Sequence, residues 1–188
     1  MSSSTQAGNP VAEIAGSAKA LRNLYYVRFG FAIVWTGLLS LTASTLTPVG
    51  IALLVAYPLF DVAAAVIDFR SSNAARPRVA LYANMALSLL AAIGLAVAAT
   101  SGIPGVLRVW GAWAITAGIV QLIVAVLRHR LGGQWAMILS GGLSAVAGTT
   151  FIAQAAGTTA TLTNVAGYAA VGGVFFLISA IRLHRRGR

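Results

Sequence analysis

The chain has 188 residues, of which 59% are hydrophobic and only 9% are charged. A water-soluble protein with so few charges would expose a large apolar surface, so the composition indicates a membrane protein. The net charge of +10 does not come from a basic stripe interleaved with aromatic residues, which argues against nucleic acid as a partner, and the absence of cysteine excludes disulfides, thiolate metal sites and cysteine nucleophiles.

The N-terminal part divides into two segments. Residues 1–9 are small and polar, and we expect a disordered tail. Asn9 and Pro10 can begin a helix, and residues 10–23 then place apolar side chains at helical spacing opposite Glu13 and Lys19. This pattern predicts either an amphipathic helix on the inner membrane surface or a cytoplasmic extension of the first membrane helix.

Six apolar runs follow, each close to the roughly 20 residues that span a bilayer as a helix. The predicted fold is therefore an all-α membrane bundle over residues 24–183, followed by a basic cytoplasmic tail at 184–188. The predicted spans are Leu24–Ser44, Val49–Phe69, Val79–Thr100, Gly105–Leu127, Gln134–Ala156 and Asn164–Leu183.

The connections between these runs predict the orientation. The first, third and fifth connections are short and uncharged, whereas every basic residue except Arg108 lies in the N-terminal flank up to Arg28, in the second and fourth connections, or in the C-terminal part from Arg182. Basic residues concentrate on the cytoplasmic side of membrane proteins. We therefore expect a multi-pass protein with both termini in the cytoplasm and the lipid bilayer as its first partner.

The chain also reads as three parallel helical hairpins, at residues 24–69, 79–127 and 134–183. A glycine in the first helix of each hairpin precedes an arginine at the end of the second by 33, 34 and 34 residues. Small residues allow close helix contact in lipid. The glycines predicted to serve helix packing are Gly30, Gly37, Gly94, Gly118, Gly141, Gly148 and Gly172.

Three two-helix units with a central glycine, and segments such as "WGAWAITAGIVQLIVAV" and "MILSGGLSAVAGTTFIA", resemble the HdeD-like short-repeat membrane proteins. The resemblance covers about Leu21 to Arg186 and implies a six-helix bacterial inner-membrane protein, in a family whose founding member is associated with acid-stress resistance. It carries over no catalytic or binding residues. The segment "YPLFDVAAAVID" departs from the usual apolar pattern of the second helix.

Asp61 within that segment is the most informative polar residue. An ionised carboxylate near the middle of a membrane costs at least about 2.5–3.5 kcal/mol, so Asp61 should face the bundle interior and be either protonated or paired. Tyr57 lies one turn away and can hydrogen-bond it, and Pro58 frees a backbone carbonyl beside it. These three residues form a candidate polar site, either a proton-responsive or ion-contacting site or a structural hydrogen bond.

Asp68 lies on the same face at the inner interface, where its depth predicts a structural ion pair with Arg28. Asn84 and Gln121 are uncharged amides that can bridge helices. With only two histidines and three acids, we expect no metal site and no cofactor.

The first functional hypothesis is a non-enzymatic membrane protein, stress-associated or accessory, that acts through helix contacts with itself or with other membrane proteins. The alternative is a small channel or proton-coupled transporter with a path at Asp61. An intramembrane enzyme ranks third, because no paired acid and base occur and no catalytic residue can be named. A polar cavity that reaches Asp61 from one face would favour transport.

Overall fold

The computed structural model describes residues 10–71, 78–127, 135–158 and 160–186. They form the helices α1 (Pro10–Ser40), α2 (Pro48–Ser71), α3 (Arg78–Ala98), η1 (Ala99–Ser101), α4 (Gly102–Leu127), α5 (Trp135–Gln154) and α6 (Thr163–Arg186). No strand occurs among the described residues, which confirms the predicted all-α class. A helix pairs its backbone groups internally, as a chain in lipid requires.

Three stretches of the described chain are long and apolar enough to cross a membrane: Pro48–Arg70, Arg78–Val126 and Thr163–Arg185. The second contains both α3 and α4. Between these helices Gly102 adopts a φ of 72° and donates its N–H to the carbonyl of Ala99, which glycine does without strain. These lengths and compositions indicate a membrane protein.

The two ends of the chain continue the helices further than the hydropathy pattern predicted. α1 runs unbroken from Pro10, so residues 10–23 continue directly into its apolar part. α6 extends to Arg186, so most of the predicted basic tail is helical. The predicted disordered tail at 1–9, the last two residues, 187 and 188, and the basic residues Arg76, Arg128 and Arg130 lie outside the described residues.

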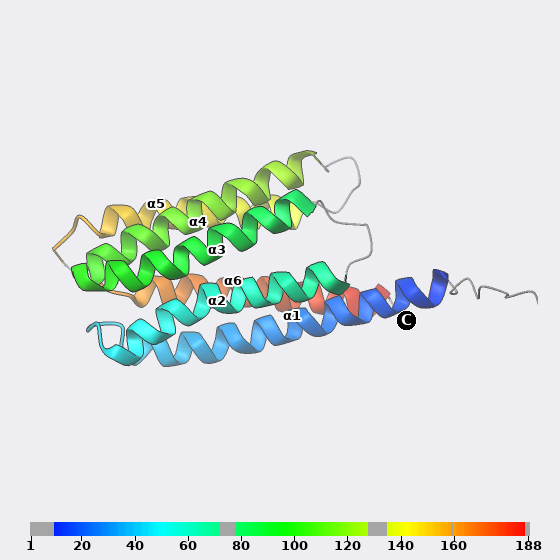
Figure 1. Cartoon of the computed structure of the whole chain (residues 1–188), viewed down its shortest axis with the longest axis horizontal. Helices are drawn as coiled ribbons and strands as arrows, with labels where there is room; N and C mark the ends of the chain where they lie inside the picture. The colour runs from blue at the N-terminus through cyan, green and yellow to red at the C-terminus, as the bar shows by residue number, and fades with distance from the viewer. Residues whose placement is uncertain (1–9, 72–77, 128–134, 159, 187–188) are drawn as a thin grey trace, which may run out of the picture.

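The helices run along one long axis (Figure 1), and their contacts form a ring. Each helix contacts the next along the chain, and α6 returns to α1. The most extensive packing is between α4 and α5, between α1 and α6, and between α2 and α3. These are neighbours from different predicted hairpins, whereas α5 and α6, which one hairpin was predicted to join, share less contact than any other two consecutive helices.

Glycines set the close approach of α4 and α5. A Cβ added at Gly111 would lie 2.5 Å from the carbonyl oxygen of Gly148, and one added at Gly148 would lie 2.5 Å from that of Gly111. Two turns away, Gly118 and Gly141 face each other in the same way, at 2.6 and 2.8 Å. The two backbones touch at these pairs, which leaves room for no side chain.

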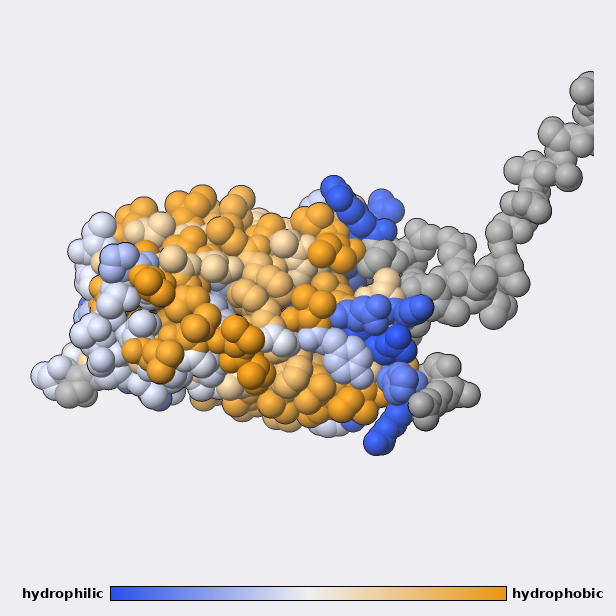
Figure 2. Space-filling model, turned by 90° about the horizontal axis from the view of Figure 1, so that it is seen from below, coloured by the Kyte–Doolittle hydropathy of each residue, from blue (hydrophilic) through white to orange (hydrophobic). Residues whose placement is uncertain are grey.

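The bundle has two unlike ends. We call the end where α2 and α6 finish, with Arg70 and Arg182, and where α3 begins with Arg78, the base-rich end. Figure 2 shows hydrophilic side chains gathered there, next to a broad hydrophobic belt. The belt includes exposed Val34, Leu90 and Val146, whose side chains are 64%, 65% and 64% exposed. Such a belt is the surface that lipid would cover.

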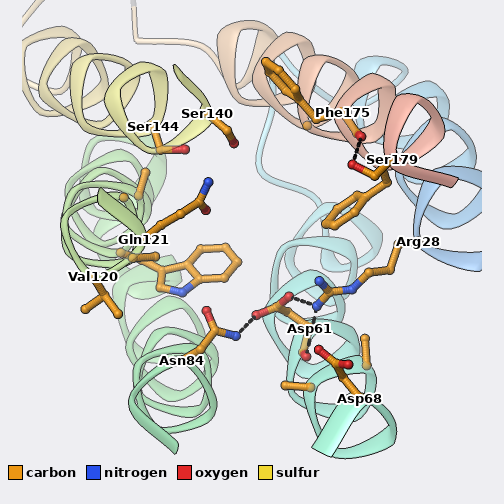
Figure 3. A pocket seen from close by; sticks show the side chains of 18 of the residues that line it. Arg28, Asp61, Asp68, Asn84, Val120, Gln121, Ser140, Ser144, Phe175 and Ser179 are labelled. Carbon is orange, nitrogen blue, oxygen red and sulfur yellow. Dashed lines mark hydrogen bonds and ion pairs between the residues drawn. The ribbon is translucent and has the colours of Figure 1, made fainter. Parts of the chain in front are cut away.

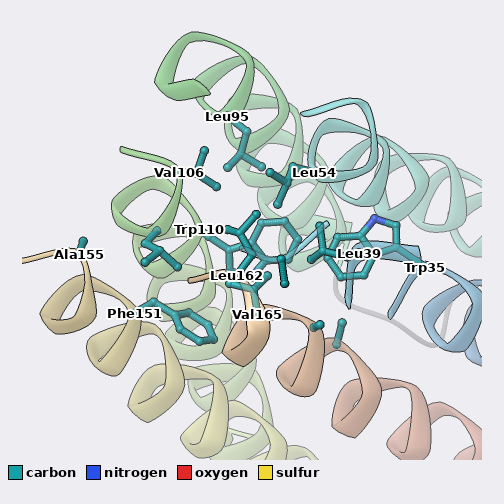
Figure 4. Close-up of a cluster of buried hydrophobic side chains, with 14 residues drawn as sticks. Trp35, Leu39, Leu54, Leu95, Val106, Trp110, Phe151, Ala155, Leu162 and Val165 are labelled. Atoms are coloured by element: carbon teal, nitrogen blue, oxygen red, sulfur yellow. The ribbon is translucent and has the colours of Figure 1, made fainter. Parts of the chain in front are cut away.

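The half of the bundle away from the base-rich end is filled by a hydrophobic cluster (Figure 4). Its largest members, Trp35 and Trp110, stack with ring centroids 5.5 Å apart, and Leu39, Leu54 and Leu107 pack with them. At this end the backbone N–H of Leu162 donates to the carbonyl of Ala43 at 3.0 Å, which joins α1 to the start of α6. The cluster closes the ring at this end.

Candidate functional site

A cavity of about 440 Å³ lies inside the ring, in the half next to the base-rich end. This volume falls within the range of about 300–1,000 Å³ that is typical of small-molecule sites. Every helix from α1 to α6 contributes to its wall, in order through Arg28, Asp61, Asn84, Gln121, Ser144 and Ser179. The cavity therefore lies between all six helices, within the half of the bundle next to the base-rich end.

The carboxylate of Asp61 has polar contacts with three side chains of neighbouring helices, two of which are drawn in Figure 3. Its Oδ1 forms an ion pair with Nη2 of Arg28. Its Oδ2 accepts hydrogen bonds from Nδ2 of Asn84 and from Oγ of Ser88, both at 2.8 Å. Ser88 is completely buried. Three donors from α1 and α3 thus hold one carboxylate of α2.

This network explains how a carboxylate can lie so far from both ends of α2. Asp61 is ten residues from the end of α2 at Ser71, or about 15 Å at the helical rise of about 1.5 Å per residue. A buried ion pair offsets its desolvation only when the remaining lone pairs are also satisfied, and Asn84 and Ser88 do this for Asp61. In the structure Asp61 is paired with Arg28.

The partner of Arg28 differs from the predicted one. The sequence predicted an ion pair between Arg28 and Asp68. In the structure the guanidinium of Arg28 pairs with Asp61 instead. It also lies 4.8 Å from the centroid of the Phe176 ring. Asp68 is buried, at 5% exposure, and lines the same cavity nearer the base-rich end. The arginine therefore reaches deeper into the bundle than its predicted position at the interface.

The register of the first two helices explains this difference. Arg28 lies twelve residues before Ser40, the end of α1, whereas Asp61 lies thirteen residues after Pro48, the start of α2. Counting from the shared loop therefore places Arg28 level with Asp61, while Asp68 lies two turns further along. The predicted first span ended at Ser44, whereas α1 ends at Ser40, which places Arg28 about one turn nearer the shared loop than predicted.

Tyr57 and Pro58 lie beside Asp61, and Tyr57 also packs against the hydrophobic cluster. Among the described contacts of Tyr57, aromatic packing dominates: its ring lies 4.6 Å from that of Trp35, and no hydrogen bond to Asp61 is present. Pro58 is fully buried and cannot donate to the carbonyl four residues earlier. The indole of Trp35 donates to the nearby carbonyl of Leu53 at 2.6 Å. Tyr57 therefore lies at the boundary between cavity and cluster.

The rest of the wall combines aromatic rings with single hydroxyl groups. The hydroxyl of Tyr168 donates to Oγ of Ser144 at 2.9 Å, and Ser179 donates to the backbone of Phe175 at 2.8 Å. Within the described part of the chain, the buried indole N–H of Trp113, another wall residue, has no partner. The wall thus offers a few polar groups on a largely apolar and aromatic surface.

The predicted packing glycines separate into two groups. Gly118, Gly141 and Gly148 lie in the close contact of α4 and α5, and a Cβ at Gly94 would meet the side chain of Val109 at 3.0 Å. A Cβ added at Gly30, Gly37 or Gly172 would meet nothing within 4 Å. Gly172 lines the cavity instead.

Sequence reasoning missed three participants: Ser88, Phe176 and Gly111. Ser88 and Asn84 are four residues apart on α3, a spacing that places two donors on one helix face, and this was the available signal. Gly111 and Gly118 repeat the two-turn spacing of Gly141 and Gly148, which was a signal for the α4–α5 contact. No comparable sequence pattern pointed to Phe176.

In this wall the carboxylate of Asp61 and the guanidinium of Arg28 neutralise each other. The described residues contain no group of three metal-ligating side chains. Comparisons with protein-family models, with curated proteins and with solved structures found no match.

Proposed function

We propose that this chain is a multi-pass protein of a bacterial inner membrane, with six spans and both termini in the cytoplasm, and that its central cavity binds a small solute and conducts it past Asp61. In this reading the base-rich end faces the cytoplasm, in accordance with the positive-inside rule. The protein works without catalysis. The resemblance to HdeD-like proteins adds acid stress as the setting in which such a path would serve the cell.

The observation that carries the proposal is the cavity of about 440 Å³ at the buried Arg28–Asp61 pair. Ionisable residues inside a membrane protein are costly and commonly mark a substrate or ion path. A pair that served only to hold helices together would need no open space beside it. The hydrophobic cluster around Trp35 and Trp110 would then be the closed gate of the path.

A second candidate function rests on a different observation. Gly30 and Gly37 lie on an exposed face of α1, and a Cβ at either would meet nothing within 4 Å. Exposed glycines two turns apart suit close packing against a helix of another chain. They favour an accessory role through contacts with a second copy or another membrane protein, and the mass of the complex in mild detergent would report such an assembly.

Flux through proteoliposomes tests the transport proposal. Vesicles that contain the full chain should take up at least one of three probes, protons, tetramethylammonium or chloride, faster than empty vesicles. Asp61→Asn should reduce that flux about tenfold or more, since the path passes the carboxylate. Leu59→Val, on the exposed face of the same helix, should leave it unchanged. Flux equal to that of empty vesicles for all three probes would refute transport, and equal flux in Asp61→Asn would remove Asp61 from the path.

A further inference from the structure

Two members of the cavity wall are held very differently. Asp61 has a short side chain, and Asn84 and Ser88 fix one of its oxygens from α3. Arg28 has a long side chain with about 2 kcal/mol of rotamer freedom, and it contacts Asp61 and the ring of Phe176. If the ion pair opens, the carboxylate stays in place and the guanidinium moves.

The guanidinium also has a second acceptor within the cavity. Asp68 lies seven residues after Asp61 on the same face of α2, about 10 Å closer to the base-rich end, and it lines the same cavity. An arginine that leaves Asp61 can therefore turn towards Asp68 and the basic surface beyond it. Long basic side chains commonly reach towards the interface in this way.

The place that the guanidinium would leave is suited to a cation. It has a fixed carboxylate on one side and the face of Phe176 on the other, and the wall adds the rings of Tyr25, Tyr57 and Trp113. Aromatic faces attract cations when their centres lie within about 6 Å, and Arg28 itself demonstrates such a contact at 4.8 Å. Aromatic rings around a carboxylate are the usual surroundings of a bound organic ammonium group.

An anion fits less well. It would have to draw Arg28 away from Asp61 and would leave that carboxylate without its cation. The anion would then lie beside a carboxylate of the same sign that has lost its neutralising partner. The same cavity therefore discriminates by charge in favour of a cation.

We infer that the cavity is a binding site for a small hydrophobic organic cation, such as a quaternary or protonated aromatic amine, and that Arg28 is the internal cation that this ligand displaces from Asp61 and Phe176. The inference rests on the proposed function and names its substrate class. Arg28 holds the empty site neutral at Asp61, and the ligand takes over this role when it binds.

Equilibrium dialysis of the full chain in detergent tests the inference, with benzyltrimethylammonium as the cationic probe and phenylmethanesulfonate as an anion of similar shape. The cation should bind saturably at one site per chain, and the anion should not compete. Arg28→Gln should raise the affinity for the cation about tenfold, because it removes the internal competitor, whereas Phe176→Leu should lower it about fivefold. Asp61→Asn should lower it about tenfold or more.

The thermal unfolding of each variant is recorded first, to show that it folds. If Asp61→Asn does not fold, the affinities of Arg28→Gln and Phe176→Leu test the inference. Saturable binding of the anion that is lost in Arg28→Gln would overturn the cation site while leaving a solute cavity. Cation binding that falls in Arg28→Gln would overturn the displacement. Absence of binding by either probe, with Asp61-dependent flux of another solute retained, would overturn the substrate class alone. Absence of both would overturn the proposed function too.

Discussion

Alanine at Gly148 is expected to lower the free energy of unfolding by about 2–3 kcal/mol, the cost of overpacking a close contact. The added Cβ would lie 2.5 Å from the backbone oxygen of Gly111 and 2.9 Å from the backbone nitrogen of Ile115. Backbone atoms cannot rotate aside, so α4 and α5 would have to separate along their length. Reversible unfolding in mixed detergent micelles, followed by circular dichroism, measures the loss.

Gly37→Ala is the matched control for this substitution. Gly37 holds the equivalent place in the predicted repeat, but its added Cβ would meet nothing within 4 Å. Its substitution should change the free energy of unfolding by less than about 0.5 kcal/mol, as exposed changes do. Equal losses for the two variants would contradict the α4–α5 contact described here.

Removal of one member of the Arg28–Asp61 pair is expected to cost about 3 kcal/mol, because the other charge would remain buried without a partner. The two side chains are only 16% and 21% exposed. Arg28→Ala leaves the carboxylate of Asp61 with the donors Asn84 and Ser88 but without a cation. The same unfolding measurement reports the loss.

The double variant Arg28→Gln with Asp61→Asn should recover most of that stability, since it leaves neither charge in the bundle. Arg108→Gln, which removes an exposed arginine at the opposite end of the bundle, should change stability by less than about 0.5 kcal/mol. Additive losses in the double variant would show that the two side chains do not interact.

Hydropathy alone predicted the helix positions well. The predicted span Val79–Thr100 corresponds to α3 at Arg78–Ala98, and Gly105–Leu127 corresponds to α4 at Gly102–Leu127. Glycine and proline between apolar runs mark these boundaries because they interrupt helical hydrogen bonding. Such signals are local, and the sequence contains them directly.

The neighbours across the ring were much harder to predict. Hydropathy does not say which faces meet, so the pairing of Gly111 with Gly148 and the contact of Arg28 with Phe176 could not be derived from it. Asp61 was recognised as a polar site because a carboxylate in an apolar helix is costly wherever it faces. Its partner required the register between α1 and α2, which depends on where the shared loop begins.

The central claim is that a water-accessible path leads from the base-rich end to Asp61. The chain has no cysteine, so a single introduced thiol reports access without interference. Ser144→Cys places the thiol on the cavity wall, and Val146→Cys places a control on the exposed face of the same helix, where the native side chain is 64% exposed.

A membrane-impermeant methanethiosulfonate reagent is added to vesicles of either orientation. We expect Ser144→Cys to react only when the base-rich end faces the reagent, and Val146→Cys to react from neither side. A thiol at Ser144 that stays unreacted from both sides, or that reacts no faster than the one at Val146, would contradict the path.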